Sequence, residues 1–193
     1  MCGGQHGPRM NFLDMSLFAL VNAGAGTPMW RIHFAAVVSN FLPALMVLVL
    51  AVLALMRPQR RRVLWTALVS LLVAWLLVNL IRGWMPMPRP AALELGTQWL
   101  PQGPRSGFPS LHATGSFAVA MALVLHGRDR WALLFVIAAC AIAWSRVYLG
   151  LHFPTDVLAG AALGGLVALC VLGVRRLAFG RRRNPRDARR ALP

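Results

Sequence analysis

The chain has 193 residues, of which 58% are apolar and only 13% are charged. A soluble domain of this length is nearer half apolar and a quarter charged, so the composition argues against a soluble globular protein. Long apolar runs alternate with short basic segments, which is typical of a polytopic membrane protein. We expect residues 1–193 to form a single membrane-embedded domain, because the length suits one helical bundle.

The net charge is +15 and comes from arginine alone, because the sequence contains no lysine. Such basicity is compatible with nucleic-acid binding. The arginines, however, lie at the ends of the apolar runs, so we expect no nucleic-acid partner. The arginine-rich segment at residues 175–193 instead predicts a basic cytoplasmic tail beside anionic lipids.

Six apolar segments follow one another along the chain. Residues 12–21 are amphipathic but too short to cross a bilayer, which requires about 20 residues, so we expect them to lie in the interface. The predicted spans are residues 30–56, 63–81, 110–125, 131–146 and 155–174. The predicted fold class is all-α, a polytopic transmembrane bundle of about five spanning helices plus a short N-terminal interfacial helix.

The segments between the spans predict an orientation. With five spans, the basic residues 57–62, Arg128 and Arg130 lie on the same side as the tail, which is therefore expected to be cytoplasmic. The loops at residues 82–109 and 147–154 then face outward together. Basic residues are usually enriched on the cytoplasmic side of a membrane, yet the outward side also carries arginines. Their presence there suggests an anion-binding function. They are Arg82, Arg89, Arg105 and Arg146.

The first segment with chemical character is the proline-rich stretch at residues 82–90, which carries Arg82 and Arg89. Prolines restrict the backbone, and guanidinium groups suit bidentate phosphate binding. The second segment comprises residues 108–113. It contains Ser110, a favoured N-cap residue, so the third span is expected to begin there. The free backbone N–H groups and positive dipole end of that helix would form an anion site within reach of His112.

The third segment runs from Ser145 to Asp156. Arg146 ends one predicted span and His152 precedes the next. Asp156 follows His152 by four residues, close enough to accept a hydrogen bond from one imidazole nitrogen. That bond would fix the tautomer and leave the other nitrogen free as a nucleophile.

Each of these residues also has a simpler interpretation. A histidine at a helix end is usually a surface or capping residue, and an arginine at a membrane edge commonly snorkels. The joint occurrence of two histidines, an aspartate, a serine and three arginines on one face is what indicates chemistry. Only two acids, Glu94 and Asp156, lie on that face. They cannot supply a two-metal cage, so we expect no metal and no cofactor.

The three segments together resemble the signature of the phosphatidic acid phosphatase type 2 (PAP2) superfamily, relatives of the vanadium haloperoxidases. That signature reads Lys-x6-Arg-Pro, then Pro-Ser-Gly-His, then Ser-Arg-x5-His-x3-Asp. The chain departs from it twice, with Arg82 in place of lysine and Leu111 in place of glycine. Residues 16–22 and 144–152 are similar to the bacterial undecaprenyl-diphosphate phosphatases of this superfamily.

The resemblance implies a role for each residue. His152 is the nucleophile, Asp156 orients it, and His112 is the acid and base. The phosphate is held by a larger set of groups, namely the side chains of Arg82, Arg89, Arg146 and Ser110 and the backbone of Leu111. The implied activity is metal-independent hydrolysis of undecaprenyl diphosphate at the outer face of the bacterial cytoplasmic membrane, which recycles the lipid carrier of cell-wall synthesis.

Other functions are compatible with the same residues. Phosphatidylglycerophosphate, phosphatidic acid and lipid A are alternative substrates, and a phosphohistidine can also pass its phosphate to an acceptor other than water. Outside catalysis, a lipid binder or a transporter is conceivable. A transporter would be expected to show internal repeats, which are absent from this sequence. A degenerate binder would be expected to lack His112, His152 or Asp156, and all three are present.

Overall fold

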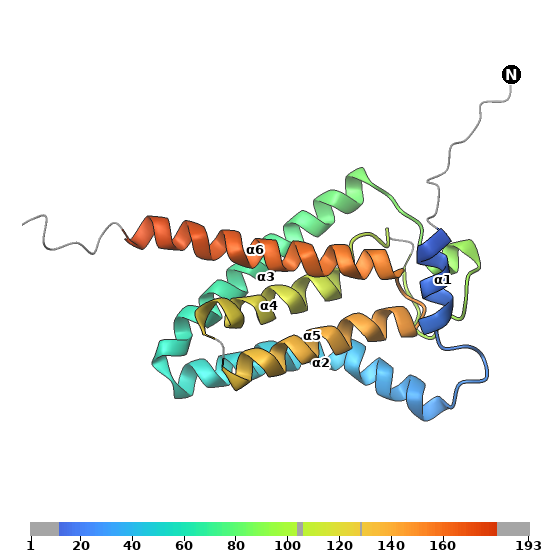
Figure 1. Ribbon diagram of the computed structural model, residues 1–193, viewed down its shortest axis with the longest axis horizontal. Helices are drawn as coiled ribbons and strands as arrows, with labels where there is room; N and C mark the ends of the chain where they lie inside the picture. Colours follow the sequence, from blue (N-terminus) through green and yellow to red (C-terminus); the bar gives the residue numbers. More distant parts are fainter. Residues whose placement is uncertain (1–11, 104–105, 128, 181–193) are drawn as a thin grey trace, which may run out of the picture.

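The computed structural model describes residues 12–103, 106–127 and 129–180. These residues form helices and connecting segments with no strand (Figure 1), which confirms the predicted all-α fold. The bundle consists of α2 (Met29–Met56), α3 (Arg61–Trp84), α4 (Leu111–His126), α5 (Arg130–Tyr148) and α6 (Pro154–Gly180). The remaining elements are α1 (Phe12–Val21) and two short 3-10 turns, η1 (Pro58–Arg60) and η2 (Pro90–Leu93).

Within the described chain, four helical segments are long and apolar enough to cross a membrane: α2, η1 with α3, α5 and α6. The fifth predicted span is α4, which has 16 residues. Its length is about 24 Å at 1.5 Å per residue, less than a hydrocarbon core of roughly 30 Å. It need not span the bilayer unaided, because it packs against α2, α3, α5 and α6 and is surrounded by them.

The closest packing in the bundle joins α4 to α6 through small residues. Gly160 and Gly164 are spaced as in a GxxxG motif, which allows two helix backbones to approach each other. A Cβ atom at Gly160 would lie 2.7 Å from the Ser110 carbonyl oxygen, and one at Gly164 would collide with the Thr114 carbonyl. The two helices therefore meet backbone to backbone, and this contact holds the first turn of α4 beside the first turns of α6.

Large apolar side chains cover the outside of the bundle as well as its core. Phe41 on α2 is 68% exposed and Leu72 on α3 is 58% exposed. The core proper contains Leu50, Leu123 and Ile142, which are almost completely buried. A bundle that is apolar on both its inner and outer surfaces is expected in lipid rather than in water.

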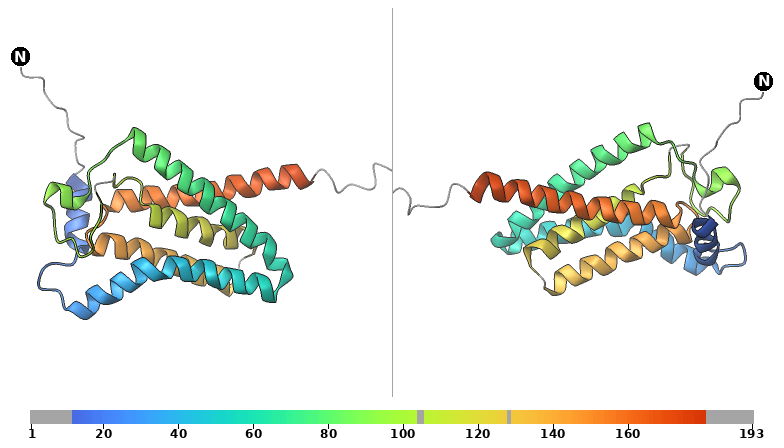
Figure 2. Two further views of the ribbon diagram at one scale, coloured as in Figure 1. Left: turned by 180° about the vertical axis from the view of Figure 1, so that it is seen from behind. Right: turned by 45° about the horizontal axis from the view of Figure 1, so that its top comes forward.

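The two ends of the bundle are made of different segments (Figure 2). One end gathers the α2–α3 turn, the α4–α5 turn and the C-terminal end of α6, where Arg60 forms an ion pair with Asp129. Helix α6 continues to Gly180, beyond the predicted end of the last span at residue 174, and the Arg175 side chain donates to the Arg62 carbonyl at 3.0 Å. Residues 181–193, Arg105 and Arg128 lie outside the described residues.

The opposite end carries α1, the segments at residues 85–103 and 106–110, and the short connection between α5 and α6 (Figures 1 and 2). Helix α1 lies across this end and is tied to the N-terminus of α6. The Asp14 carboxylate accepts hydrogen bonds from the Thr155 backbone N–H at 2.9 Å and from its hydroxyl at 2.5 Å. Phe18 packs on Phe153 with ring centroids 5.4 Å apart. The short first helix thus braces the connection that contains His152.

Candidate active site

His152 lies in the tight connection at residues 149–153. The turn depends on Gly150, whose φ is +74° and where a Cβ atom would collide with the Thr97 carbonyl. The Leu151 N–H donates to the Arg146 carbonyl at 3.0 Å, which folds the chain back toward α5. As a result His152 is only 1% exposed, although it belongs to no helix.

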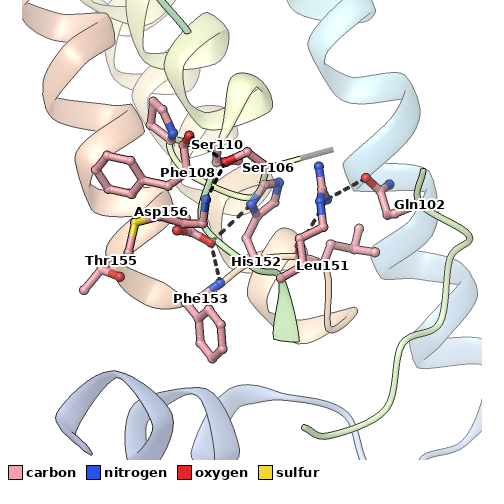
Figure 3. Close-up of polar contacts among 12 residues, drawn as sticks. Gln102, Ser106, Phe108, Ser110, Leu151, His152, Phe153, Thr155 and Asp156 are labelled. Atoms are coloured by element: carbon pink, nitrogen blue, oxygen red, sulfur yellow. Dashed lines mark hydrogen bonds and ion pairs between the residues drawn. The ribbon is translucent and has the colours of Figure 1, made fainter. Parts of the chain in front are cut away.

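The Asp156 carboxylate lies between the His152 ring and the Phe153 backbone (Figure 3). Its Oδ2 is 3.4 Å from His152 Nδ1 and accepts a hydrogen bond from the Phe153 N–H at 2.9 Å. The predicted pairing is therefore present, but as a contact at ion-pair distance rather than a hydrogen bond. The same carboxylate oxygen therefore contacts both the imidazole ring and the Phe153 N–H.

The electrostatic surroundings keep His152 neutral. Burial, reinforced by the positive charges of Arg146, Arg89 and Arg82, holds the pKa of His152 well below its usual value. Burial and nearby cations both disfavour the protonated form of an imidazole. A neutral imidazole is the form that can act as a nucleophile.

Arg146 lies at the C-terminal end of α5 and is only 2% exposed. One amino group, NH1, donates to the Ser39 hydroxyl of α2 at 2.7 Å. Its Nε has no hydrogen-bond partner. A buried guanidinium with an unused donor is costly unless an anion binds to it.

The other two predicted arginines are held by backbone carbonyls. Arg82 donates from Nε and NH2 to the Pro109 carbonyl at 3.3 and 2.9 Å, which links the end of α3 to the start of α4. Arg89 donates from NH1 to the Leu151 carbonyl at 3.2 Å and to the Gln102 side chain at 2.7 Å. These bonds fix the guanidinium groups of both side chains around one space.

Helix α4 begins beside Asp156, as the Ser110 N–H donates to the Asp156 carbonyl at 2.9 Å. Ser110 occupies the predicted N-cap position, and the helix itself starts one residue later, at Leu111. The Ser110 hydroxyl, however, makes no capping bond and is buried without a partner. The N-cap preference of serine therefore predicts the start of the helix correctly, although the expected hydrogen bond from the helix backbone to the Ser110 hydroxyl is not formed.

These residues enclose a cavity of ≈ 350 Å³. Its lining combines both predicted histidines with the three arginines and contains Arg82, Arg89, Gln102, Gly103, Leu111, His112, Arg146 and His152. Asp156 lies behind His152. Gln102 was missed because it lies in a polar loop outside any motif, and Ser39 was missed because a serine within an apolar run carries no catalytic signal.

A second cavity of ≈ 330 Å³ lies between α2, α3 and α4. Its walls are mostly apolar, and they include Met46, Leu71 and Trp75. Leu111 and His112 line both cavities, so the polar site and the apolar space adjoin at the first turn of α4. Together the two cavities can take a molecule with an anionic head and an apolar chain.

A site of this composition at the end of a membrane helix bundle is that of a lipid phosphate phosphatase, and the chain belongs to the PAP2 superfamily, whose profile it matches over residues 63–179. It is 36% identical over 157 residues to the putative undecaprenyl-diphosphatase YbjG of Escherichia coli (strain K12), covering 79% of this chain and 77% of that one. These matches confirm the predicted family and the prediction that the protein is a phosphatase embedded in a membrane by several helices.

Two further comparisons support the same assignment. The decaprenylphosphoryl-5-phosphoribose phosphatase of Mycobacterium tuberculosis (strain ATCC 25618 / H37Rv) is 35% identical over 129 residues, or 64% of this chain and 68% of the relative. The crystal structure of Aquifex aeolicus LpxE superposes with a TM-score of 0.69 at 26% identity, covering 83% of this chain and 95% of that one.

Proposed function

We propose that the protein removes the terminal phosphate of undecaprenyl diphosphate, producing undecaprenyl phosphate and inorganic phosphate, without a metal ion. The observation that carries this proposal is the pair of adjoining cavities. The diphosphate would occupy the arginine-lined cavity, and the first part of the polyprenyl chain would lie in the apolar cavity between α2, α3 and α4. The names of YbjG, a putative undecaprenyl-diphosphatase, and of the mycobacterial relative, a decaprenylphosphoryl-5-phosphoribose phosphatase, support a polyprenyl chain.

The reaction proceeds in two steps. Neutral His152, oriented by Asp156 through Nδ1, attacks the terminal phosphorus through Nε2, and the bond from phosphorus to the bridging oxygen breaks. His112 protonates that oxygen as undecaprenyl phosphate leaves. A water molecule then attacks the phosphohistidine, His112 takes its proton, and the bond from phosphorus to nitrogen breaks to release inorganic phosphate.

The remaining groups stabilise charge. Asp156 balances the positive charge that His152 acquires as it becomes phosphorylated. Arg82, Arg89 and Arg146, with the Ser110 hydroxyl and the Leu111 N–H, hold the phosphoryl oxygens, which is the main contribution of protein groups to phosphoryl transfer. The site faces the exterior of a bacterial cytoplasmic membrane, because the basic turns and the start of the basic tail lie at the opposite end of the bundle.

The test is phosphate release by the purified protein in detergent with EDTA. Undecaprenyl diphosphate is compared with phosphatidic acid and phosphatidylglycerophosphate, and His152→Ala is the control. We expect EDTA-insensitive release with a clear preference for the polyprenyl diphosphate, and an acid-labile phosphoenzyme that His152→Ala does not form. A preference for a glycerolipid contradicts the proposed substrate. Turnover by His152→Ala contradicts the nucleophile, and loss of activity in EDTA contradicts metal independence.

A further inference from the structure

Ser39 is a completely buried serine in the middle of α2, within an apolar run and outside the three motifs. A hydroxyl in such surroundings is unfavourable unless it is hydrogen-bonded. Its oxygen accepts a hydrogen bond from Arg146 NH1 at 2.7 Å, across 107 positions of sequence. The contact joins α2 to the end of α5 at the wall of the arginine-lined cavity.

The surroundings of Arg146 make this contact important. Among the described residues no carboxylate forms an ion pair with the Arg146 guanidinium, and its Nε is unpaired. An arginine side chain has several rotatable bonds, so it must be held if its planar fork is to meet a phosphate in one geometry. Ser39 holds one amino group of the fork on the side of α2, while the side chain lines the cavity.

We propose that Ser39 is a positioning residue for phosphate binding, acting through Arg146. By engaging NH1 it orients the guanidinium so that the remaining donors point toward the phosphoryl group. The inference rests on the proposed role of Arg146 in holding phosphate. Helix α2 would then contribute to both cavities. Ser39 contacts Arg146 of the arginine-lined cavity, and Pro43, one turn further along, lines the apolar cavity.

The test measures the inhibition constant of orthovanadate, a phosphate analogue that probes the cavity without the lipid chain. The variants are Ser39→Ala, Ser39→Thr, Arg146→Lys and Ser70→Ala. Ser70 is a matched control, because it is also completely buried, lies on the neighbouring helix α3 and has a hydroxyl with no partner. The inhibition constant is a property of the folded, active molecules, so a loss of folded protein alone does not change it.

Hydrogen bonds to charged groups contribute enough that we expect Ser39→Ala to raise the orthovanadate inhibition constant about tenfold or more. We expect Ser39→Thr, which keeps the hydroxyl, to recover most of the affinity, and Ser70→Ala to match the wild type. An unchanged constant in Ser39→Ala, with a raised constant in Arg146→Lys, overturns the role of Ser39 alone. If Arg146→Lys also leaves the constant unchanged, the proposed phosphate-binding role of Arg146 fails, and the inference fails with it.

Discussion

Replacing Gly160 with alanine tests whether the close approach of α4 and α6 sets the geometry of the active site. A Cβ atom at this position would lie 2.7 Å from the Ser110 carbonyl oxygen and 3.0 Å from the Thr114 hydroxyl. Ordinary contacts begin at 3.4 Å, so the two backbones must separate by about 0.7 Å. Ser110 belongs to the N-terminus of α4, which carries His112, whereas α6 carries Asp156.

This displacement is expected to lower both the free energy of unfolding and kcat/KM. Overpacking a close contact costs about 1–3 kcal/mol, of which the better helix propensity of alanine recovers about 0.5–1 kcal/mol. We therefore expect a net loss of about 1 kcal/mol in the free energy of unfolding, and no more than about 2.5 kcal/mol. A misplacement of about 1 Å at a catalytic centre can lower the rate 100-fold, so we expect kcat/KM to fall by about 10- to 100-fold.

The assay is phosphate release from undecaprenyl diphosphate, with thermal unfolding in the same detergent to follow stability. Gly173→Ala is the matched control, because this glycine lies on the same helix and a Cβ atom there would meet nothing within 4 Å. We expect the control to keep wild-type activity and to be slightly more stable. If Gly160→Ala and Gly173→Ala have the same kcat/KM, the packing of α4 on α6 does not control the catalytic geometry.

Three further predictions concern separate parts of the molecule. Arg89→Gln removes a cation that lowers the pKa of His152, so that pKa rises and the acidic limb of the kcat/KM profile moves to higher pH. A limb that stays in place would rule out this electrostatic effect. Ala74→Leu narrows the apolar cavity, and we expect KM for undecaprenyl diphosphate to rise about tenfold while orthovanadate inhibition is unchanged. An unchanged KM would mean that the lipid chain lies elsewhere. Asp129→Ala removes both the N-cap bond to the Ala132 N–H at 3.0 Å and the ion pair with Arg60, so we expect a loss of about 1–2 kcal/mol in the free energy of unfolding, seen as a lower melting temperature at unchanged kcat/KM. An unaltered melting temperature would show that neither contact stabilises the start of α5.

The parts of the site that sequence reasoning predicted are those encoded over short distances. His152 and Asp156 are four residues apart across a helix start, and their side chains face each other in the structure. The apolar runs likewise predict the helices, with ends that shift by a few residues. The largest shift is at α6, which continues past Arg175 to Gly180, as arginine is compatible with a helix interior.

Contacts between distant segments could not be predicted in this way. The hydrogen bond from Arg146 to Ser39 and those from Thr155 to Asp14 connect helices whose relative placement depends on the packing of the whole bundle. No periodicity within a helix distinguishes Ser39 from Ser70, since both are buried serines in apolar runs. Only the position of Arg146 in three dimensions shows which of them has a partner.

Helix α1 has a structural role that its sequence pattern alone does not predict. Its length and amphipathic pattern predict a helix lying in the interface, which explains its exposed apolar residues, such as Leu20 at 82%. Its buried residues have a separate purpose, because Asp14 caps the N-terminus of α6 one residue before Asp156, and Phe18 packs on the residue that follows His152. We therefore expect one face of the helix to meet the lipid surface, whereas the other face supports His152 and Asp156 through Phe153 and Thr155.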